Sequence, residues 1–149
     1  MEGSMLRKVV MGLRIRNLYY LIAGVLALLF AFTHAWNGQF TVLPKLDIKT
    51  VSIDTQTAFT YVWHIITAEN LVFGIAFLMM SFQKERSKMH FAAWIIVAML
   101  GVRLMVILGV TVMFDVSGLT DTLLDSVAIV FYIALIILGT RMRGKKIQQ

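Results

Sequence analysis

The sequence predicts an all-α integral membrane protein, folded as a four-helix transmembrane bundle in one domain over residues 1–149. Hydrophobic residues make up 59% of the chain and charged residues only 15%, whereas soluble domains carry about a quarter charged residues. Four apolar runs each reach the ~20 residues that a helix needs to cross a bilayer. Because these runs are uninterrupted, they favour helices over the alternating ten-residue strands of an outer-membrane barrel.

The first apolar run is expected to stay as a membrane helix. Its apolar core is longer than the 7–15 residues typical of a cleavable signal peptide, and no clear small-x-small cleavage site follows it. Small residues at Gly24, Ala27, Ala31 and Ala35 form a stripe that permits close packing against another helix. The four predicted spans cover residues 17–36, 58–82, 91–114 and 120–140.

The loop between the first two spans, residues 37–57, is the longest non-helical segment that we expect. It contains Pro44, and residues 49–54 alternate polar and apolar types with many β-branched side chains. That pattern is compatible with a short β-hairpin over the outer end of the bundle. A loose surface loop is an equally good interpretation.

The basic residues predict how the chain is oriented. The net charge is +6, and Lys and Arg cluster before the first span, in the loop 83–90 and after the last span. By the positive-inside rule, both termini and the loop 83–90 face the cytoplasm, and the short turn 115–119 faces outward. We expect the inner membrane of a bacterium. The clusters indicate the lipid bilayer as a partner rather than nucleic acid.

The absence of cysteine excludes several kinds of chemistry. With no Cys in the chain, there can be no disulfide, iron–sulfur cluster, thiolate zinc site or cysteine nucleophile.

Each of the last three spans contains a residue that carries a formal charge well inside the span: Glu69, Arg103 and Asp125. A charge at the bilayer centre costs roughly 2.5–3.5 kcal/mol even on the lenient insertion scale, which suggests a shared interior polar site. At about 1.5 Å per residue, Glu69 and Arg103 reach a similar depth near the midplane and can form a buried ion pair. His64 and Asp125 lie nearer the outer surface, at roughly 8–9 Å depth.

These four residues are our candidates for catalysis. Glu69 or Asp125 would accept a proton, His64 would shuttle it, and Arg103 would anchor an anion or carbonyl. Alternatively, the same residues only fix helix packing. Since His64 and Glu69 are five residues apart, they point about 140° from each other on a helix and cannot both face one neighbouring helix squarely. Further candidates for ligand binding are His34, Thr67, Asn70, Asp121 and Tyr132.

A metal or a haem is a weaker hypothesis. Imidazole and carboxylate ligands suit Zn, Fe or Mn, and His34, His64 and Asp125 could supply them. No closely spaced ligand motif is present, however, and the sequence requires no cofactor.

Three functions are compatible with this pattern. In the first, a polar cavity in the outer half binds a ligand or acts on a lipid-soluble or outer-side substrate. The second is a small, dimeric, proton-coupled transporter, because four helices rarely enclose a full pathway. The third is an accessory or assembly subunit of a larger membrane partner, in which the polar residues serve helix recognition.

Overall fold

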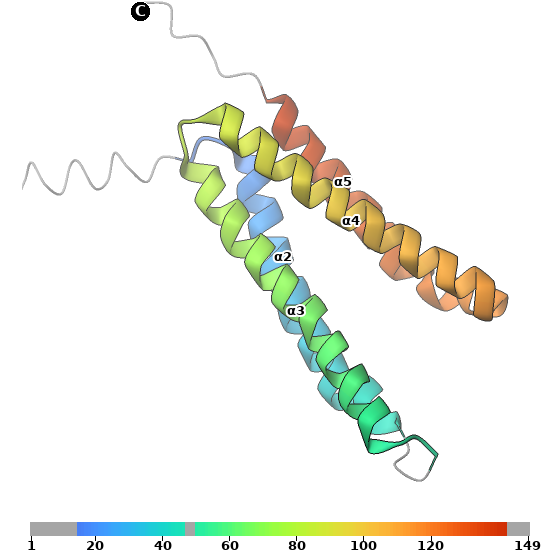
Figure 1. The fold of residues 1–149 in the computed structure, drawn as a ribbon. Helices are drawn as coiled ribbons and strands as arrows, with labels where there is room; N and C mark the ends of the chain where they lie inside the picture. The colour runs from blue at the N-terminus through green and yellow to red at the C-terminus, as the bar shows by residue number, and fades with distance from the viewer. Residues whose placement is uncertain (1–14, 47–49, 143–149) are drawn as a thin grey trace, which may run out of the picture. The chain divides into compact units, whose positions relative to one another are not determined.

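The computed structural model describes residues 15–46 and 50–142, and all of its regular structure is helical. Four helices follow one another: α2 (Leu18–Asn37), α3 (Ile53–Phe82), α4 (Arg86–Phe114) and α5 (Leu119–Arg141) (Figure 1). Each helix is long and apolar enough to cross a membrane. The prediction of an all-α chain with four apolar helices is confirmed for the described residues, and the length and composition of these helices are compatible with a four-helix membrane bundle.

The helix ends follow local capping signals. Asn17 Oδ1 accepts a hydrogen bond from the Tyr20 N–H at 3.2 Å, which is the N-cap interaction expected at the start of α2. Ser52 Oγ likewise accepts from the Thr55 N–H at 3.3 Å, so α3 begins five residues before the predicted span. The start of α4 at Arg86 shortens the predicted loop 83–90 to three residues.

The segment after α2 differs from a hairpin. A π-helical turn, η1 (Gly38–Val42), and a 3₁₀ turn, η2 (Leu43–Lys45), continue the helix directly. Pro44 fits in the first turn of η2, where no backbone N–H is needed. The described part of this loop contains no strand, because helical hydrogen bonding continues through residues 38–45; residues 47–49 of the predicted hairpin lie outside the described residues.

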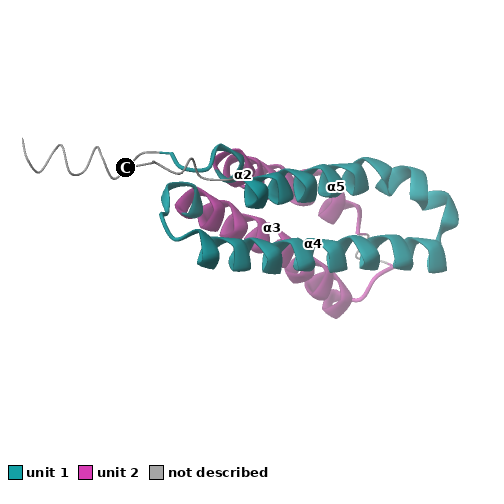
Figure 2. Ribbon diagram, turned by 90° about the horizontal axis from the view of Figure 1, so that it is seen from above, with its two compact units in different colours: residues 1–20, 80–149 teal, residues 21–79 magenta. Residues whose placement is uncertain are grey.

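The chain divides into two compact units (Figure 2). Unit 2 comprises residues 21–79 and holds most of α2 and α3. Unit 1 comprises residues 1–20 and 80–149, so it holds α4 and α5 together with the first turn of α2 and the end of α3. The prediction of one domain for residues 1–149 stays a prediction.

Within unit 2, α2 and α3 approach closely through glycines. A Cβ added at Gly24 would lie 2.8 Å from the Leu78 backbone nitrogen, and one at Gly74 would lie 3.1 Å from the Gly24 carbonyl oxygen. Ala27 and Ala31 are buried on the same helix. Small residues let membrane helices pack backbone to backbone, so this face of α2 fixes how the two helices are aligned.

Within unit 1, α4 and α5 pack against each other and are joined by a tight turn, η3 (Val116–Gly118). The Ser117 hydroxyl donates to Asp115 Oδ1 at 2.5 Å, and the Gly118 N–H donates to the Asp115 carbonyl at 3.0 Å. The Ser117 hydroxyl, followed by backbone N–H groups, lowers the pKa of the Asp115 carboxyl below its ordinary value. This turn therefore favours the ionised carboxylate.

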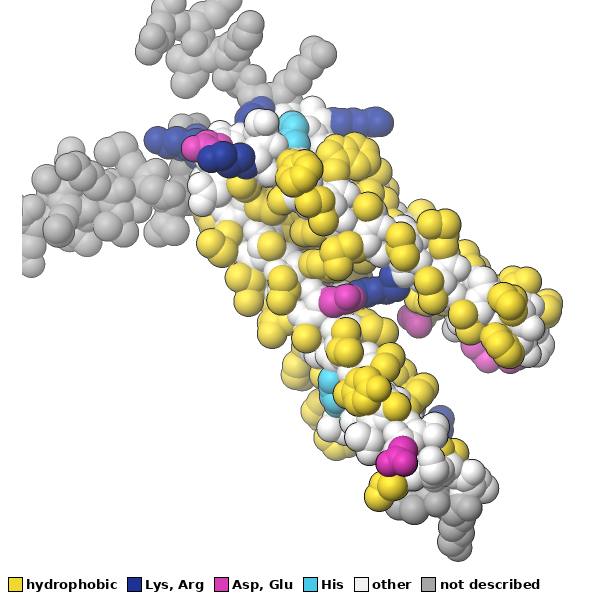
Figure 3. Space-filling model, viewed as in Figure 1, with side chains coloured by type: hydrophobic (Ala, Val, Ile, Leu, Met, Phe, Trp, Pro, Cys, Tyr) yellow, Lys and Arg dark blue, Asp and Glu magenta, His cyan; other side chains and the backbone are white. Residues whose placement is uncertain are grey.

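Hydrophobic side chains cover most of the visible face of the helices, and Lys and Arg gather where α3 is joined to α4 (Figure 3). The described members of this basic group are Arg16, Lys84, Arg86, Lys88 and Arg141. The remaining basic residues of the two termini, among them Arg7, Lys8 and Lys145, lie outside the described residues.

Candidate functional site: a polar groove on α3

A shallow groove runs along the N-terminal half of α3 in unit 2. Its volume is about 650 Å³, and its lining comes from this helix alone. From the first to the last lining residue, positions 56 to 68, the helix rises about 18 Å at ~1.5 Å per residue. The groove is therefore elongated. Its lining residues are Gln56, Thr57, Thr60, Tyr61, His64, Ile65 and Ala68.

Two of the polar lining residues, Gln56 and Thr60, are hydrogen-bonded to the backbone, and His64 is not. Thr60 Oγ1 donates to the Gln56 carbonyl at 2.8 Å, and Gln56 Nε2 donates to the Val51 carbonyl at 3.4 Å. The half-buried His64 makes no hydrogen bond within the described part of the chain. A neutral imidazole has one donor and one acceptor nitrogen, so His64 can offer both to a bound molecule.

Unit 2 carries a second histidine, His34, which has a different environment. Its ring stacks on the Trp63 indole with centroids 4.4 Å apart and an interplanar angle of 7°. Trp63 Nε1 donates to the His34 carbonyl at 3.0 Å. Gly38 lies directly against the indole, where any Cβ would clash with Trp63. His34 thus belongs to the contact that joins the C-terminal end of α2 to α3, not to the groove.

The geometry of the groove is therefore the main guide to function. No model of a known protein family, no curated protein and no solved structure matches this chain. Any function must be argued from the residues themselves.

The four candidate catalytic residues are divided between the two units. His64 and Glu69 belong to unit 2, whereas Arg103 and Asp125 belong to unit 1. The predicted pairs, Glu69 with Arg103 and His64 with Asp125, therefore stay predictions. Glu69 and Arg103 are half-buried and each has an interaction partner, while Asp125 is exposed on α5.

The candidate ligand-binding residues lie in varied surroundings, and none of them lines the groove. Asn70 is buried on α3, with 8% of its surface exposed, and Tyr132 is buried on α5, with 2% exposed. Asp121 is exposed near the start of α5. Thr67 has a buried hydroxyl oxygen with no hydrogen-bond partner among the described residues.

The part of the chain that the structure describes contains no group of side chains that supports the metal hypothesis. No three His, Asp or Glu side chains come together there in a group that could hold a metal ion. His34 and His64 are both in unit 2, but the imidazole of His34 is covered on one face by Trp63. His34, His64 and Asp125 therefore remain candidates from the sequence alone.

The sequence reasoning missed some residues that the structure brings together. Gln56, Thr57 and Tyr61 line the groove with His64, and their spacing of three to four residues along one helix could have revealed this face. It also missed a cavity at the basic end of unit 1, because each basic cluster was interpreted separately as a signal for orientation.

Proposed function

We propose that this chain is a membrane protein that binds an elongated, lipid-soluble molecule with a polar group in the groove of α3. The observation that carries the proposal is the position of His64, which makes no hydrogen bond with any described residue and lies in a groove of about 650 Å³. Ligand pockets typically have volumes of about 300–1,000 Å³. Ile65 and Ala68 offer an apolar wall for a hydrocarbon chain, and His64 with Tyr61 offers hydrogen bonds to its polar group.

Binding is supported better than catalysis. An acid–base mechanism needs a second titratable group within hydrogen-bond reach of the reacting atoms. The groove lining contains His64 but no carboxylate. Glu69, on the same helix, points about 140° away from His64. A catalytic role for Glu69, Arg103 or Asp125 thus depends on their pairing across the two units, which stays a prediction.

Photolabelling of the full chain tests this proposal. A long-chain alcohol carrying a diazirine, which has no charge, would be added to the protein in phosphatidylcholine nanodiscs, and labelled peptides would be mapped by mass spectrometry. We expect labelling to concentrate at residues 56–68 and to fall when the unlabelled alcohol is in excess. His64→Leu should lower it about fivefold, the effect of losing about one hydrogen bond.

His90→Leu is the matched control, because it removes a histidine that lies outside the groove. Labelling in this variant should equal that of the wild type. Labelling spread evenly over exposed helix faces, and unchanged by His64→Leu, would show that the alcohol only dissolves in the surrounding lipid.

A second proposal is that another membrane protein, in the simplest case a second copy of this chain, covers the polar face of α3. A face with Gln56, Thr60 and His64 is costly to leave against lipid tails, and a dimer would also provide the larger pathway that a proton-coupled transporter needs. Because the chain has no cysteine, single substitutions allow clean crosslinking. Oxidation should link Ala68→Cys chains to each other but leave Val112→Cys chains, with the exposed cysteine on α4, as monomers.

A dimer would then be tested for transport in proteoliposomes with a pH gradient. Co-purification of a different membrane protein would favour an accessory or assembly role instead.

The orientation is part of the same proposal. Five of the seven described cations lie at the helix ends next to residues 15–17, 83–88 and 141, whereas Lys45 ends η2 and Arg103 lies within α4. The positive-inside rule places helix ends with such a cluster in the cytoplasm. Both termini would then be cytoplasmic, with the protein in the inner membrane of a bacterium. The groove of α3 would belong to the outer half of the bilayer.

A further inference from the structure

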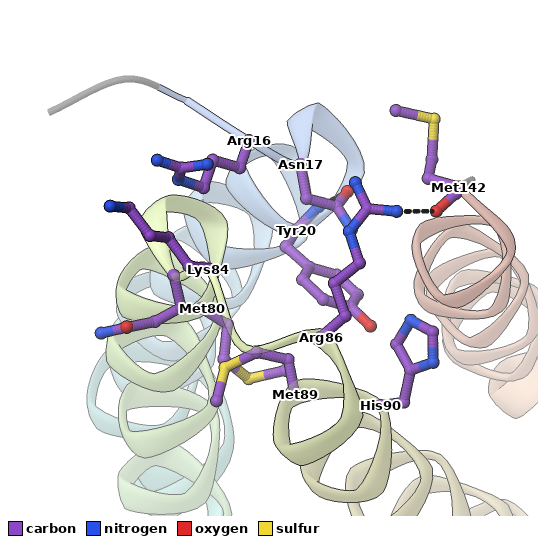
Figure 4. A pocket seen from close by; sticks show the side chains of 10 residues that line it. Arg16, Asn17, Tyr20, Met80, Lys84, Arg86, Met89, His90 and Met142 are labelled. Atoms are coloured by element: carbon purple, nitrogen blue, oxygen red, sulfur yellow. Dashed lines mark hydrogen bonds between the residues drawn. The ribbon is translucent and has the colours of Figure 1, made fainter. Parts of the chain in front are cut away.

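A small cavity lies at the basic end of unit 1. Its volume is about 60 Å³. Ten side chains line it, from the start of α2, the end of α3, the loop 83–85, the start of α4 and the residue after α5. Tyr20 lies among them, with Arg16 and Lys84 on one side in this view and Arg86 and His90 on the other (Figure 4).

Hydrogen bonds hold the elements around this cavity in place. The Ser81 carbonyl accepts from the backbone N–H groups of Arg16 and Asn17 at 2.8 and 3.2 Å. Asn17 Nδ2 donates to the Gly139 carbonyl at 2.8 Å. The Tyr20 ring packs on Gly139, where a Cβ would lie 2.6 Å from Tyr20 Cε1. The start of α2 is thus fixed to the ends of both α3 and α5, so the walls of the cavity are held in place by hydrogen bonds and packing.

The lining is cationic and contains no acidic side chain. Arg16, Lys84 and Arg86 contribute three positive charges. Glu85 is the acidic residue closest to them in sequence, and it is paired with Lys88, whose Nζ lies 2.6 Å from Glu85 Oε2. Three cations without a counter-charge in the lining favour an anion.

Arg86 is also held in position. Its Nη1 donates to the Met142 carbonyl at 2.9 Å, which orients the guanidinium at the edge of the cavity. A guanidinium has five N–H donors in a planar fork that suits phosphate, so several remain for a ligand. In addition, α4 begins at Arg86, and the N–H groups of a helix's first turn favour anions.

The size of the cavity limits what can enter it. A cavity of roughly 10–15 Å³ admits one water molecule, so about 60 Å³ has room for a compact group of a few heavy atoms. A phosphate group meets this limit, whereas a hydrocarbon chain does not. The cavity lies at the ends of the apolar helices, the level at which lipid headgroups are found, and basic pockets between membrane helices commonly bind anionic headgroups.

We propose that this cavity is a binding site for a phosphate group, held by Arg16, Lys84 and Arg86. The phosphate comes either from the headgroup of an anionic phospholipid or from a free phosphate compound in solution. This site is independent of the groove of α3, because it shares no lining residue with it.

Binding to the full chain would be measured in nanodiscs. Phosphatidylglycerol would be titrated into phosphatidylcholine nanodiscs and bound lipid quantified by native mass spectrometry; inorganic phosphate would be titrated separately. We expect Arg86→Gln and Lys84→Gln each to lower the affinity for phosphatidylglycerol about tenfold, as expected for one hydrogen bond to a charged group.

Lys88→Gln is the matched control, because it removes one positive charge from the same segment but lies outside the cavity lining. Its affinity should stay within about twofold of the wild type, the scale of a screened surface charge. Lys84 has an exposed side chain, so Lys84→Gln keeps the test valid if Arg86→Gln disturbs the fold, which circular dichroism would reveal.

The outcomes separate the two sources of phosphate. Tight binding of phosphatidylglycerol that inorganic phosphate does not compete with supports a lipid headgroup, and competition by phosphate supports a soluble compound. If Lys84→Gln and Lys88→Gln weaken binding equally, the attraction is only that of a basic surface for an anionic membrane, and the proposed site is wrong.

Discussion

The closest approach of α2 and α3 gives the sharpest prediction, which concerns Gly24. A Cβ at this position would lie 2.8 Å from the Leu78 backbone nitrogen, whereas ordinary van der Waals contacts begin at 3.4 Å. Gly24→Ala therefore requires the helices to separate locally by about 0.6 Å, the difference between these two distances (3.4 − 2.8). The atom that must move is backbone, so a side-chain rotation cannot relieve the clash.

The expected loss can be estimated from two opposing effects. Overpacking in a well-packed interior costs about 1–3 kcal/mol, while replacing a helical Gly by Ala returns about 0.5–1 kcal/mol through chain entropy. A net destabilisation of about 1–2 kcal/mol follows from these two ranges. The measurement is unfolding of the full chain by SDS titration from mixed micelles, monitored by tryptophan fluorescence, with Trp36 and Trp63 both in unit 2.

Two other glycines provide matched controls. A Cβ at Gly101 or Gly109 of α4 would meet nothing within 4 Å, so Gly101→Ala and Gly109→Ala should leave stability unchanged or raise it slightly. If Gly24→Ala is as stable as these controls, the backbone contact between α2 and α3 does not limit their packing, and the reasoning is refuted.

Three further predictions concern hydrogen bonds made by side chains. Trp63→Phe should destabilise unit 2 by about 1 kcal/mol, because it keeps an aromatic ring against His34 but loses the hydrogen bond to the His34 carbonyl. SDS titration measures this change, and a loss of stability as large as that of Trp63→Ala would contradict the prediction. Asn17→Ala should lower the stability by about 1–2 kcal/mol through loss of the α2 cap and of the hydrogen bond to the Gly139 carbonyl. Asn17→Ser should recover part of this stability, and equal stabilities of the Ala and Ser variants in SDS titration would argue against the capping role. The Ser117 hydroxyl lowers the pKa of the Asp115 carboxyl, so the stability that this hydrogen bond adds is complete above the unfolded pKa of about 3.9 and disappears as the pH falls through the lower folded pKa. Ser117→Ala should therefore unfold more easily than the wild type at pH 7 but equally easily near pH 2. A difference in stability that persists in acid would exclude this mechanism.

The helices were predictable because apolar runs of this length leave the backbone no alternative in a membrane. Their starts were harder to predict. Ser52 caps α3 five residues before its apolar run begins, and a polar first turn carries no hydrophobic signal. The β-branched residues of 49–54 suggested a strand, but the Ser52 cap commits residues from Ile53 onward to helix.

The site was less predictable, because it depends on how helices are rotated and aligned. The stack of His34 on Trp63 requires a particular register between α2 and α3, which the close contact at Gly24 and Gly74 sets. No single-chain pattern contains that information. The cavity of unit 1 has the same origin. Arg16 is far in sequence from Lys84 and Arg86, and the three residues line one cavity because the hydrogen bonds of Asn17 and Ser81 join three helix ends.

The hydrogen bonds of Asn17 and Ser81 have a consequence for experiments on topology. Because Arg16, Asn17, Gln83, Lys84 and Met142 line one cavity, these three segments lie at the same end of unit 1 and, in a membrane, would face the same compartment. Only two orientations of this end of unit 1 are then possible, facing the cytoplasm or facing the outside. One accessibility measurement, for instance labelling of Gln83→Cys in intact cells with a membrane-impermeant maleimide, would assign the compartment of Arg16, Gln83 and Met142 at once.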